Sequence, residues 1–175
     1  MKTIKVAKLT LNFGAGTDQK KLAKGIKLMK LISGKEPVKT KTSKRIPGWG
    51  LRPGLPIGCK ITLRGEDAVK LVPRLVAAKE NVLSIKSFDD NGNISFGIPE
   101  YVDIPDAKYD PELGIMGFEV SMTLEKPGFR IKSRKIMKRK IPLHHRINKV
   151  DAVKYLKDNF KVKIKEEIDK EDDVQ

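Results

Sequence analysis

The order of strand-like and helix-like segments predicts an α+β domain with a mainly antiparallel sheet, helices on one face and the other face open. Two observations support this class. Several segments alternate apolar and polar residues with a period of two, and two segments repeat apolar residues with helical spacing. Their order along the chain is strand, helix, two strands, helix and further strands. A basic extension follows this domain.

The first strand is expected over residues 5–13. Its apolar face is formed by Ala7, Leu9, Leu11 and Phe13. Its polar face carries Lys8, Thr10 and Asn12. Residues 14–16 (Gly-Ala-Gly) end the strand, and Thr17 or Asp18 then caps a helix that runs to about Ile32. Ser33-Gly34 stops this helix.

Two strands and a second helix follow. The strand over residues 38–42 places Lys39 and Lys41 on one face, and the strand over residues 57–64 alternates again. Its apolar residues are Ile57, Cys59, Ile61 and Leu63, and its polar side chains are Lys60, Thr62 and Arg64. The next helix starts after Gly65 and contains Pro73, which is expected to kink it. Its apolar face consists of Ala68, Val69, Leu71, Val72, Leu75 and Val76.

The remaining strands are expected to form a hairpin and a final strand. Residues 82–88 and 93–98 flank Asp89-Asp90-Asn91-Gly92, in which Asn-Gly suits a tight turn. An acidic loop over residues 99–113 follows. The last strand places Phe118, Val120, Met122 and Leu124 on one side. We expect the helices to cover the face of Leu9, Ile61 and Val120, which leaves the polar face as a docking plane.

Composition divides the chain into three parts. Residues 1–125 form the α+β domain, with a protruding Gly/Pro-rich loop at residues 43–57, the tryptophan loop. Residues 126–165 form the basic extension with a short amphipathic helix, which Asp151 caps and whose apolar residues are Val153, Leu156 and Phe160. Residues 166–175 are an acidic tail that we expect to be disordered.

The charges are separated along the chain. Lys and Arg number 37 against 22 acids, a net charge of +15. Residues 126–149, the basic segment, carry ten Lys and Arg and no acid, whereas residues 87–125 hold nine acids and one Lys. A surface whose charges serve only solubility would intersperse positive and negative side chains. This separation favours binding of a polyanion.

The tryptophan loop points to RNA. Three prolines and four glycines between Ile46 and Gly58 disfavour a helix or a sheet ladder, so the loop is expected to be mobile and without regular hydrogen bonds. Arg45, Trp49 and Arg52 suit phosphates and unstacked bases. The alternative is that Trp49 folds back and covers the edge of the sheet.

Several other classes of protein are disfavoured. No apolar run is long enough to span a membrane, and no signal peptide is expected. The single cysteine, Cys59, cannot form an internal disulfide and fits a reducing cytosol. His144-His145 lacks metal-ligand spacing, and Gly14-Ala15-Gly16 lacks the third glycine of a dinucleotide motif. We therefore expect no enzyme, no cofactor and no metal.

Four blocks of sequence resemble a known family. They are residues 9–16 (LTLNFGAG), 34–40 (GKEPVKT), 51–58 (LRPGLPIG) and 96–100 (FGIPE), and residues 109–111 and 114–118 continue the match. In this order they resemble the large-subunit ribosomal protein family that carries 5S ribosomal RNA, the "L-five" family. The resemblance covers about residues 4–150. Beyond Lys126 it is similar to the archaeal and eukaryotic branch.

This resemblance implies a function and a set of partners. The family grips 5S rRNA with the open face of its sheet in the central protuberance of the large subunit, in the cytoplasm. Its long loop approaches P-site tRNA, and it helps to bridge to a small-subunit protein; other large-subunit proteins and 23S-type rRNA surround it. The family's RNA-binding positions fall on Asn12, Thr62, Lys35 and Trp49. Lys35 replaces an amide, so it can hold a phosphate but cannot both donate and accept hydrogen bonds.

The candidate RNA-binding residues combine the strand pattern, the loop, the basic segment and the resemblance. They are Lys8, Thr10, Asn12, Lys35, Lys39, Lys41, Arg45, Trp49, Arg52, Lys60, Thr62, Arg64, Arg130, Arg134 and Lys135. Two other functions stay open at this point. One is an RNA-binding or RNA-chaperone module outside the ribosome, and the other is a nucleotide-dependent enzyme that uses Gly14 and Gly16.

Overall fold

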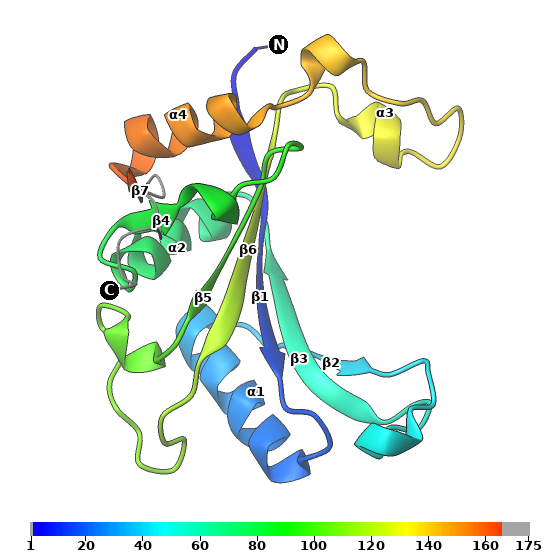
Figure 1. Cartoon of the computed structure of the whole chain (residues 1–175), viewed down its shortest axis with the longest axis vertical. Coiled ribbons are helices and arrows are strands. Elements are labelled where there is room, and N and C mark those ends of the chain that lie inside the picture. Colours follow the sequence, from blue (N-terminus) through cyan, green and yellow to red (C-terminus); the bar gives the residue numbers. More distant parts are fainter. Residues whose placement is uncertain (1, 166–175) are drawn as a thin grey trace, which may run out of the picture.

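Five antiparallel strands form the main sheet of the computed structural model, which describes residues 2–165, in the order β2-β3-β1-β6-β5. Helix α1 packs against β3 and β1, and α2 packs against β1, on the same face (Figure 1). This confirms the predicted α+β class. In chain order the strands and α-helices are β1 (Lys5–Gly14), α1 (Gln19–Ser33), β2 (Val38–Lys41), β3 (Pro56–Leu63), α2 (Glu66–Ala77), β4 (Val82–Ser84), β5 (Asn93–Ile98), β6 (Phe118–Glu125), α3 (Arg130–Ser133), α4 (Lys149–Phe160) and β7 (Lys163–Lys165). Short 3₁₀ turns are η1 (Pro47–Trp49), η2 (Ile85–Ser87), η3 (Tyr101–Asp103) and η4 (Leu143–His145).

Strand β1 lies at the centre of the sheet, and its alternation is confirmed from Lys8 onward. Leu9, Leu11 and Phe13 are buried, whereas Lys8 and Asn12 are exposed. A register shift between Val6 and Lys8 puts Val6 in the core and leaves Ala7 half-buried, so the prediction for Ala7 is wrong. A β-bulge adds one residue to the strand, which a count by twos does not reveal.

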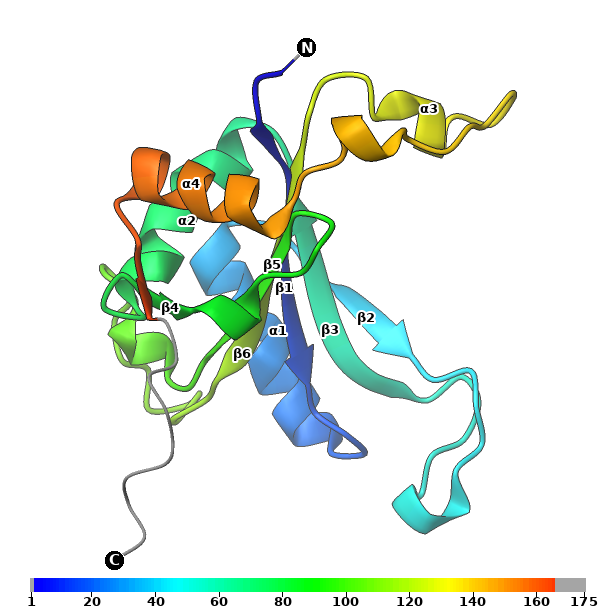
Figure 2. The same ribbon diagram turned by 45° about the horizontal axis from the view of Figure 1, so that its top comes forward.

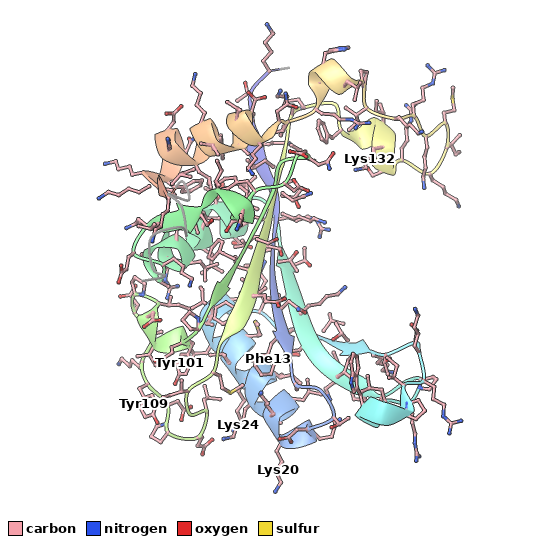
Figure 3. The ribbon with its side chains drawn as sticks, viewed as in Figure 1. Phe13, Lys20, Lys24, Tyr101, Tyr109 and Lys132 are labelled. Atoms are coloured by element: carbon pink, nitrogen blue, oxygen red, sulfur yellow. The ribbon has the colours of Figure 1, made fainter. Side chains whose placement is uncertain are left out.

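Helix α1 has the predicted ends and a close contact with the sheet. The Asp18 carboxylate accepts hydrogen bonds from two backbone N–H groups of the first turn, at 2.8 and 3.2 Å. Gly34 ends the helix in the left-handed conformation. A Cβ on Gly25 would lie 2.3 Å from the Phe13 ring, so the helix can approach β1 this closely only with glycine there (Figure 3 labels Phe13).

The apolar face of α2 is confirmed except at one position. Ala68, Leu71, Val72, Leu75 and Val76 are buried, but Val69 is 44% exposed. Val69 lies about 90° from the centre of the buried stripe, which is the margin of an amphipathic helix.

The predicted hairpin around Asp89–Gly92 is wrong in its pairing. The turn exists, since the Asp89 N–H donates to the Asn93 carbonyl at 3.0 Å and Gly92 has a φ of 76°. Strand β5, however, pairs with β6, and the preceding segment is joined to β5 by the Phe88–Ile94 bridge and the Asp89–Asn93 hydrogen bond. Strand β4 pairs in parallel with β7 instead, which lies close to the end of the described chain.

The C-terminal part of the described chain returns to the core. Ile147, Ala152, Leu156 and Val162 belong to the same buried cluster as β1 and β6. Asp151 lies in the first turn of α4 rather than at its N-cap, which is Asn148, so the predicted cap is wrong. The division at residues 125 and 165 stays a prediction, and the tail at residues 166–175 lies outside the described residues.

Two parts project from this body (Figure 2). The tryptophan loop extends the β2–β3 hairpin beyond one end of the strands. The basic segment, with α3 and η4, extends beyond the other end. Both lie on the side of the sheet that α1 and α2 leave uncovered (Figure 1).

Candidate nucleic-acid interface

The face of the sheet opposite to α1 and α2, the open face, carries the polar residues predicted from β1 and β3. The register places Thr10 directly beside Thr62 and Asn12 directly beside Lys60. Directly opposite residues of antiparallel strands share a face and lie close together. Lys8 comes next along β1, and Arg64 is the first residue after the end of β3; both are exposed. The structure thus brings together Lys8, Thr10, Asn12, Lys60, Thr62 and Arg64.

The β6 and β5 half of the open face carries polar residues that the sequence analysis missed. Asn12 Nδ2 donates a hydrogen bond to Glu119 Oε2 at 3.0 Å. Ser121 lies between Thr10 and Ser95 in the register, and the two serine Oγ atoms are 3.0 Å apart. The signal was present, because the apolar residues of β6 occupy every second position and leave Glu119 and Ser121 for the other face.

The open face therefore has a gradient of chemistry. Its β3 and β1 side presents cations and threonine hydroxyls, and its β6 and β5 side presents serine hydroxyls and the carboxylates of Glu119 and Glu125. A shallow depression of about 410 Å³ lies over the serine side, lined by Ser95, Gly97, Glu119 and Ser121 among others. Cations suit phosphates, and hydroxyl and amide groups suit the 2′-OH and base edges of RNA.

The tryptophan loop is more ordered than its composition predicts. The Thr42 N–H donates to the Leu55 carbonyl at 3.0 Å across the hairpin, and Ile46 and Leu51 exchange two bonds of 3.0 and 3.1 Å. The expectation of no regular hydrogen bonds is therefore wrong. Pro47 opens η1, where no backbone donor is needed, and Gly50 provides the left-handed turn with a φ of 64°.

Trp49 and the two arginines lie at the tip of this loop. Trp49 is 70% exposed, so the alternative in which it covers the sheet edge is wrong. Arg45 and Arg52 are also exposed, one on each side of the Ile46–Leu51 bridge. Among residues 2–165 neither arginine side chain has a hydrogen bond or ion pair. The tip therefore presents two free cations beside an aromatic plane.

Lys35 and Lys39 do not join the open face. Lys35 forms an ion pair with Asp67 at the start of α2, on the helix side, and its hydrogen bond lowers the pKa of the Asp67 carboxyl. Lys39 is directly opposite Cys59 in the strand register, and Cys59 is buried on the helix side of the sheet. Directly opposite residues share a face, so Lys39 also lies on the helix side. A register shift follows Thr40, but its extra residue, Ile57, lies in β3, so the prediction that Lys39 and Lys41 share a face stays a prediction.

The basic segment is anchored at its base and exposed at its tip. Lys126 Nζ donates to the Arg146 carbonyl and to Asp151 Oδ2, both at 3.2 Å. Arg130 and Lys135 are exposed, whereas Arg134 is half-buried and its Nε donates to the Met137 carbonyl at 2.8 Å. Arg134 therefore also supports the local turn.

The described residues contain little that suggests other chemistry. They include no group of three or more His, Cys, Asp or Glu side chains placed to hold a metal. Burial raises the pKa of the Cys59 thiol to about 11, so it stays protonated at neutral pH. No helix within residues 2–165 has the length and apolar character needed to cross a membrane.

Comparison with known proteins gives a consistent result along the chain. Residues 1–52 match the family model described as ribosomal protein L5, and residues 56–155 match the model for the C-terminus of the same ribosomal family. The large ribosomal subunit protein uL5 of Nanoarchaeum equitans is 46% identical over 165 residues, which cover 94% of this chain and 97% of that protein. Proteins of the same name from Methanosphaera stadtmanae and Sulfolobus acidocaldarius are each 43% identical. These matches cover 91% and 95% of this chain and 95% and 93% of the respective proteins.

Proposed function

Because this chain belongs to the ribosomal protein L5 family, it is a non-enzymatic component of the large ribosomal subunit in the cytoplasm, and we propose that its open face binds 5S rRNA. The family resemblance seen in the sequence is confirmed. The observation that carries the proposal is the open face itself. Thr10 with Thr62 and Asn12 with Lys60 form adjacent polar pairs on a face that no helix of the described chain covers.

The chemistry of these pairs suits a folded RNA. Lys8, Lys60 and Arg64 neutralise phosphates, which fixes the position of the RNA without reading its sequence. The amide of Asn12 and the nearby hydroxyls both donate and accept, so they distinguish ribose and base groups from a plain phosphate chain. Their strands rest on a buried core of Leu9, Leu11 and other apolar residues. The polar groups are therefore held in place before RNA binds.

The tryptophan loop makes a second RNA contact in this proposal, to tRNA in the P site. Its exposed indole offers a surface for a base or sugar, and Arg45 and Arg52 offer charges to the flanking phosphates. The loop lies beyond the end of the strands, away from the centre of the open face (Figure 1). Because the loop and the open face lie apart, each can contact a different RNA.

The remaining partners follow from the family and from the charges. The basic segment contacts phosphates of 5S or 23S-type rRNA. The position in the central protuberance, the neighbouring large-subunit proteins and the bridge to a small-subunit protein rest on the resemblance alone. RNA that reaches the edge or the helix side of the sheet would be contacted by Lys35, Lys39 and Lys41.

A binding assay with purified protein tests the main proposal. We expect the protein to bind 5S rRNA more tightly than a tRNA at equal salt, since the salt-dependent phosphate contribution is common to both. Lys60→Gln on the open face should weaken 5S binding, and Lys157→Gln on α4, with the same loss of charge, is the matched control. Equal affinity for both RNAs, or equal effects of the two variants, would contradict the proposal.

A further inference from the structure

The basic segment folds back on itself and encloses a pocket that the sequence analysis did not identify. Helix α3 and the stretch at residues 138–141 form its walls, and the Arg139 N–H donates to the Ile131 carbonyl at 3.1 Å to join them. The cavity has a volume of about 390 Å³. Figure 3 shows one of its residues, Lys132, at the far end of the molecule from the tryptophan loop.

The charge around this pocket is entirely positive. Its lining includes Lys132, Lys138, Arg139, Lys140 and Arg146, and no acid. Arg146 Nε donates to the Ile141 carbonyl at 3.3 Å, but the side chains of the other four cations have no hydrogen bond or ion pair among residues 2–165. Like charges gathered around one cavity repel each other unless an anion is bound between them. The pocket is therefore suited to an anionic ligand.

The pocket also has an apolar wall. Phe129 lines it together with Ile141 and Ile147. The Phe129 ring is half-buried and packs at 49° against His145, with ring centres 5.8 Å apart, which fixes its orientation. An inorganic phosphate would use only the cations, and an acidic peptide would not need an aromatic plane. A ligand that uses both has an anionic group beside a flat apolar ring.

We propose that this pocket holds one unstacked nucleotide of a bound RNA, with its phosphate among the lysines and its base against Phe129. This inference rests on the proposed RNA-binding function and adds a separate site to it. The open face contacts a folded RNA surface, whereas the pocket selects a position at which a nucleotide leaves the helix. RNA-binding proteins recognise such nucleotides by stacking on aromatic side chains.

Three RNA hairpins of equal length test the inference in the full-length protein. One carries a single-nucleotide bulge, one has an abasic residue at the bulge, and one is fully paired. We expect the bulged RNA to bind about tenfold more tightly than the other two, the effect typical of one base stacked on an aromatic ring. Free AMP is the fourth probe and should bind far more weakly than the bulged RNA.

Variants assign the preference to the pocket. Phe129→Leu keeps an apolar side chain but removes the ring, and it should reduce the bulge preference to about twofold or less. The pair Lys132→Gln with Lys140→Gln should weaken the bulged RNA more than the paired one. Lys135→Gln, an exposed lysine of the same segment outside the pocket, should weaken all three hairpins equally. Thermal melting checks that each variant is folded.

The possible results separate the two proposals. Tight but equal binding of all three hairpins, or a preference that survives Phe129→Leu, would overturn the pocket and leave RNA binding intact. Failure to bind any hairpin or 5S rRNA would overturn the proposed function itself. Poly-glutamate, as a further probe, represents an acidic protein segment. If poly-glutamate or AMP binds tightly at the pocket lysines and the hairpins show no bulge preference, the pocket proposal is overturned. The site then belongs to an acidic protein segment or to a free nucleotide, respectively.

Discussion

Asn12 lies in the middle of β1, exposed, with Lys60 on one side and Glu119 on the other. If its amide contacts 5S rRNA, Asn12→Ala removes oriented hydrogen bonds and should cost about 1–3 kcal/mol of binding free energy. The free energy of unfolding should hardly change, because the side chain is exposed and its protein partner is an exposed carboxylate. Gel-shift titration and urea unfolding measure the two quantities.

A matched control is Asn159→Ala, an exposed asparagine of α4 whose amide donates to the Tyr155 carbonyl. It should leave 5S affinity unchanged. An Asn12→Ala protein that is unfolded yet retains 5S affinity in its folded fraction would make Asn12 a structural residue instead.

Glu119 is the one acid next to the predicted RNA-binding residues of β1. Glu119→Gln keeps an oxygen that accepts from Asn12 but removes the negative charge that repels phosphate. We expect 5S affinity to rise by about 0.5 kcal/mol, the usual size of an exposed charge interaction, and the rise to shrink at high salt. Unchanged affinity at low salt would show that RNA does not approach this part of the open face.

The positions of single residues show what local sequence can and cannot predict. Alternation in β1 and β3 was enough to identify Thr10, Asn12, Lys60 and Thr62, because both strands are regular there. It failed for Ala7, because a bulge depends on the partner strand.

The turn between residues 89 and 93 is a local element with a pH-dependent carboxylate. Partial burial would raise the pKa of the Asp89 carboxyl, but hydrogen bonds from Asn93 and Asn91 together hold it below its ordinary value. The bonds from the backbone N–H groups of Asn91 and Asn93 measure 2.9 and 2.7 Å. Because the folded state favours the ionised form, its stabilisation is present above about pH 4 and is lost as pH falls through the lowered pKa.

Asp89→Asn should therefore destabilise the protein by about 1 kcal/mol at about pH 6, and by less at about pH 3. Urea unfolding of both proteins at both pH values gives the difference between their free energies of unfolding. The other carboxyls titrate in both proteins, so their contribution cancels in this difference. The same difference at both pH values would show that the charge of Asp89 does not stabilise the turn.

This turn was predicted correctly while its strand pairing was not. Asp89 to Gly92 is a local signal, but the partner of β4 lies at Lys163–Lys165 and the partner of β5 is β6. The pairing of distant strands depends on how the whole chain packs its core. The sequence of residues 82–84 alone does not indicate which strand they pair with.

The basic segment, as an element, is expected to hold RNA phosphates without reading bases. Replacing Arg134 and Lys135 with Ala should weaken 5S and unrelated RNAs alike and reduce the salt dependence by about one unit of slope for each lost contact. Lys154→Ala with Lys157→Ala, on α4, removes the same charge and is the control. Because Arg134 also donates to the Met137 carbonyl, Arg134→Lys shows how much of the effect is structural. An unchanged slope would mean that this segment faces protein or solvent.

The acidic loop at residues 99–113 lies apart from the basic parts in space (Figure 1), whereas Glu119 of the same acidic stretch lies on the open face. The acidic loop at residues 99–113 leaves β5 at the edge of the sheet, on the side away from the tryptophan loop (Figure 1). Within it, buried Tyr101 fixes the chain by accepting from the Asp110 N–H at 2.8 Å, while Tyr109 is exposed (Figure 3). The tryptophan loop, the open face and the basic segment thus form one continuous side free of this acidic loop. The sequence predicted the separation of charge, but not that the two projecting parts would lie beyond opposite ends of the strands.

That arrangement predicts a division of labour between the open face and the tryptophan loop. Deleting residues 47–52 removes Trp49 and Arg52 but keeps the Thr42–Leu55 hydrogen bond at the base of the hairpin. Because distant sites act almost independently, 5S affinity should stay within about twofold of the wild-type value. On assembled ribosomes, tRNA should dissociate faster from the P site. Trp49→Ala should reproduce part of this effect and Trp49→Phe less, if the ring packs on a base or sugar. A deletion that abolishes 5S binding would instead place Trp49 in the primary RNA site, with the open face and the loop gripping a single RNA.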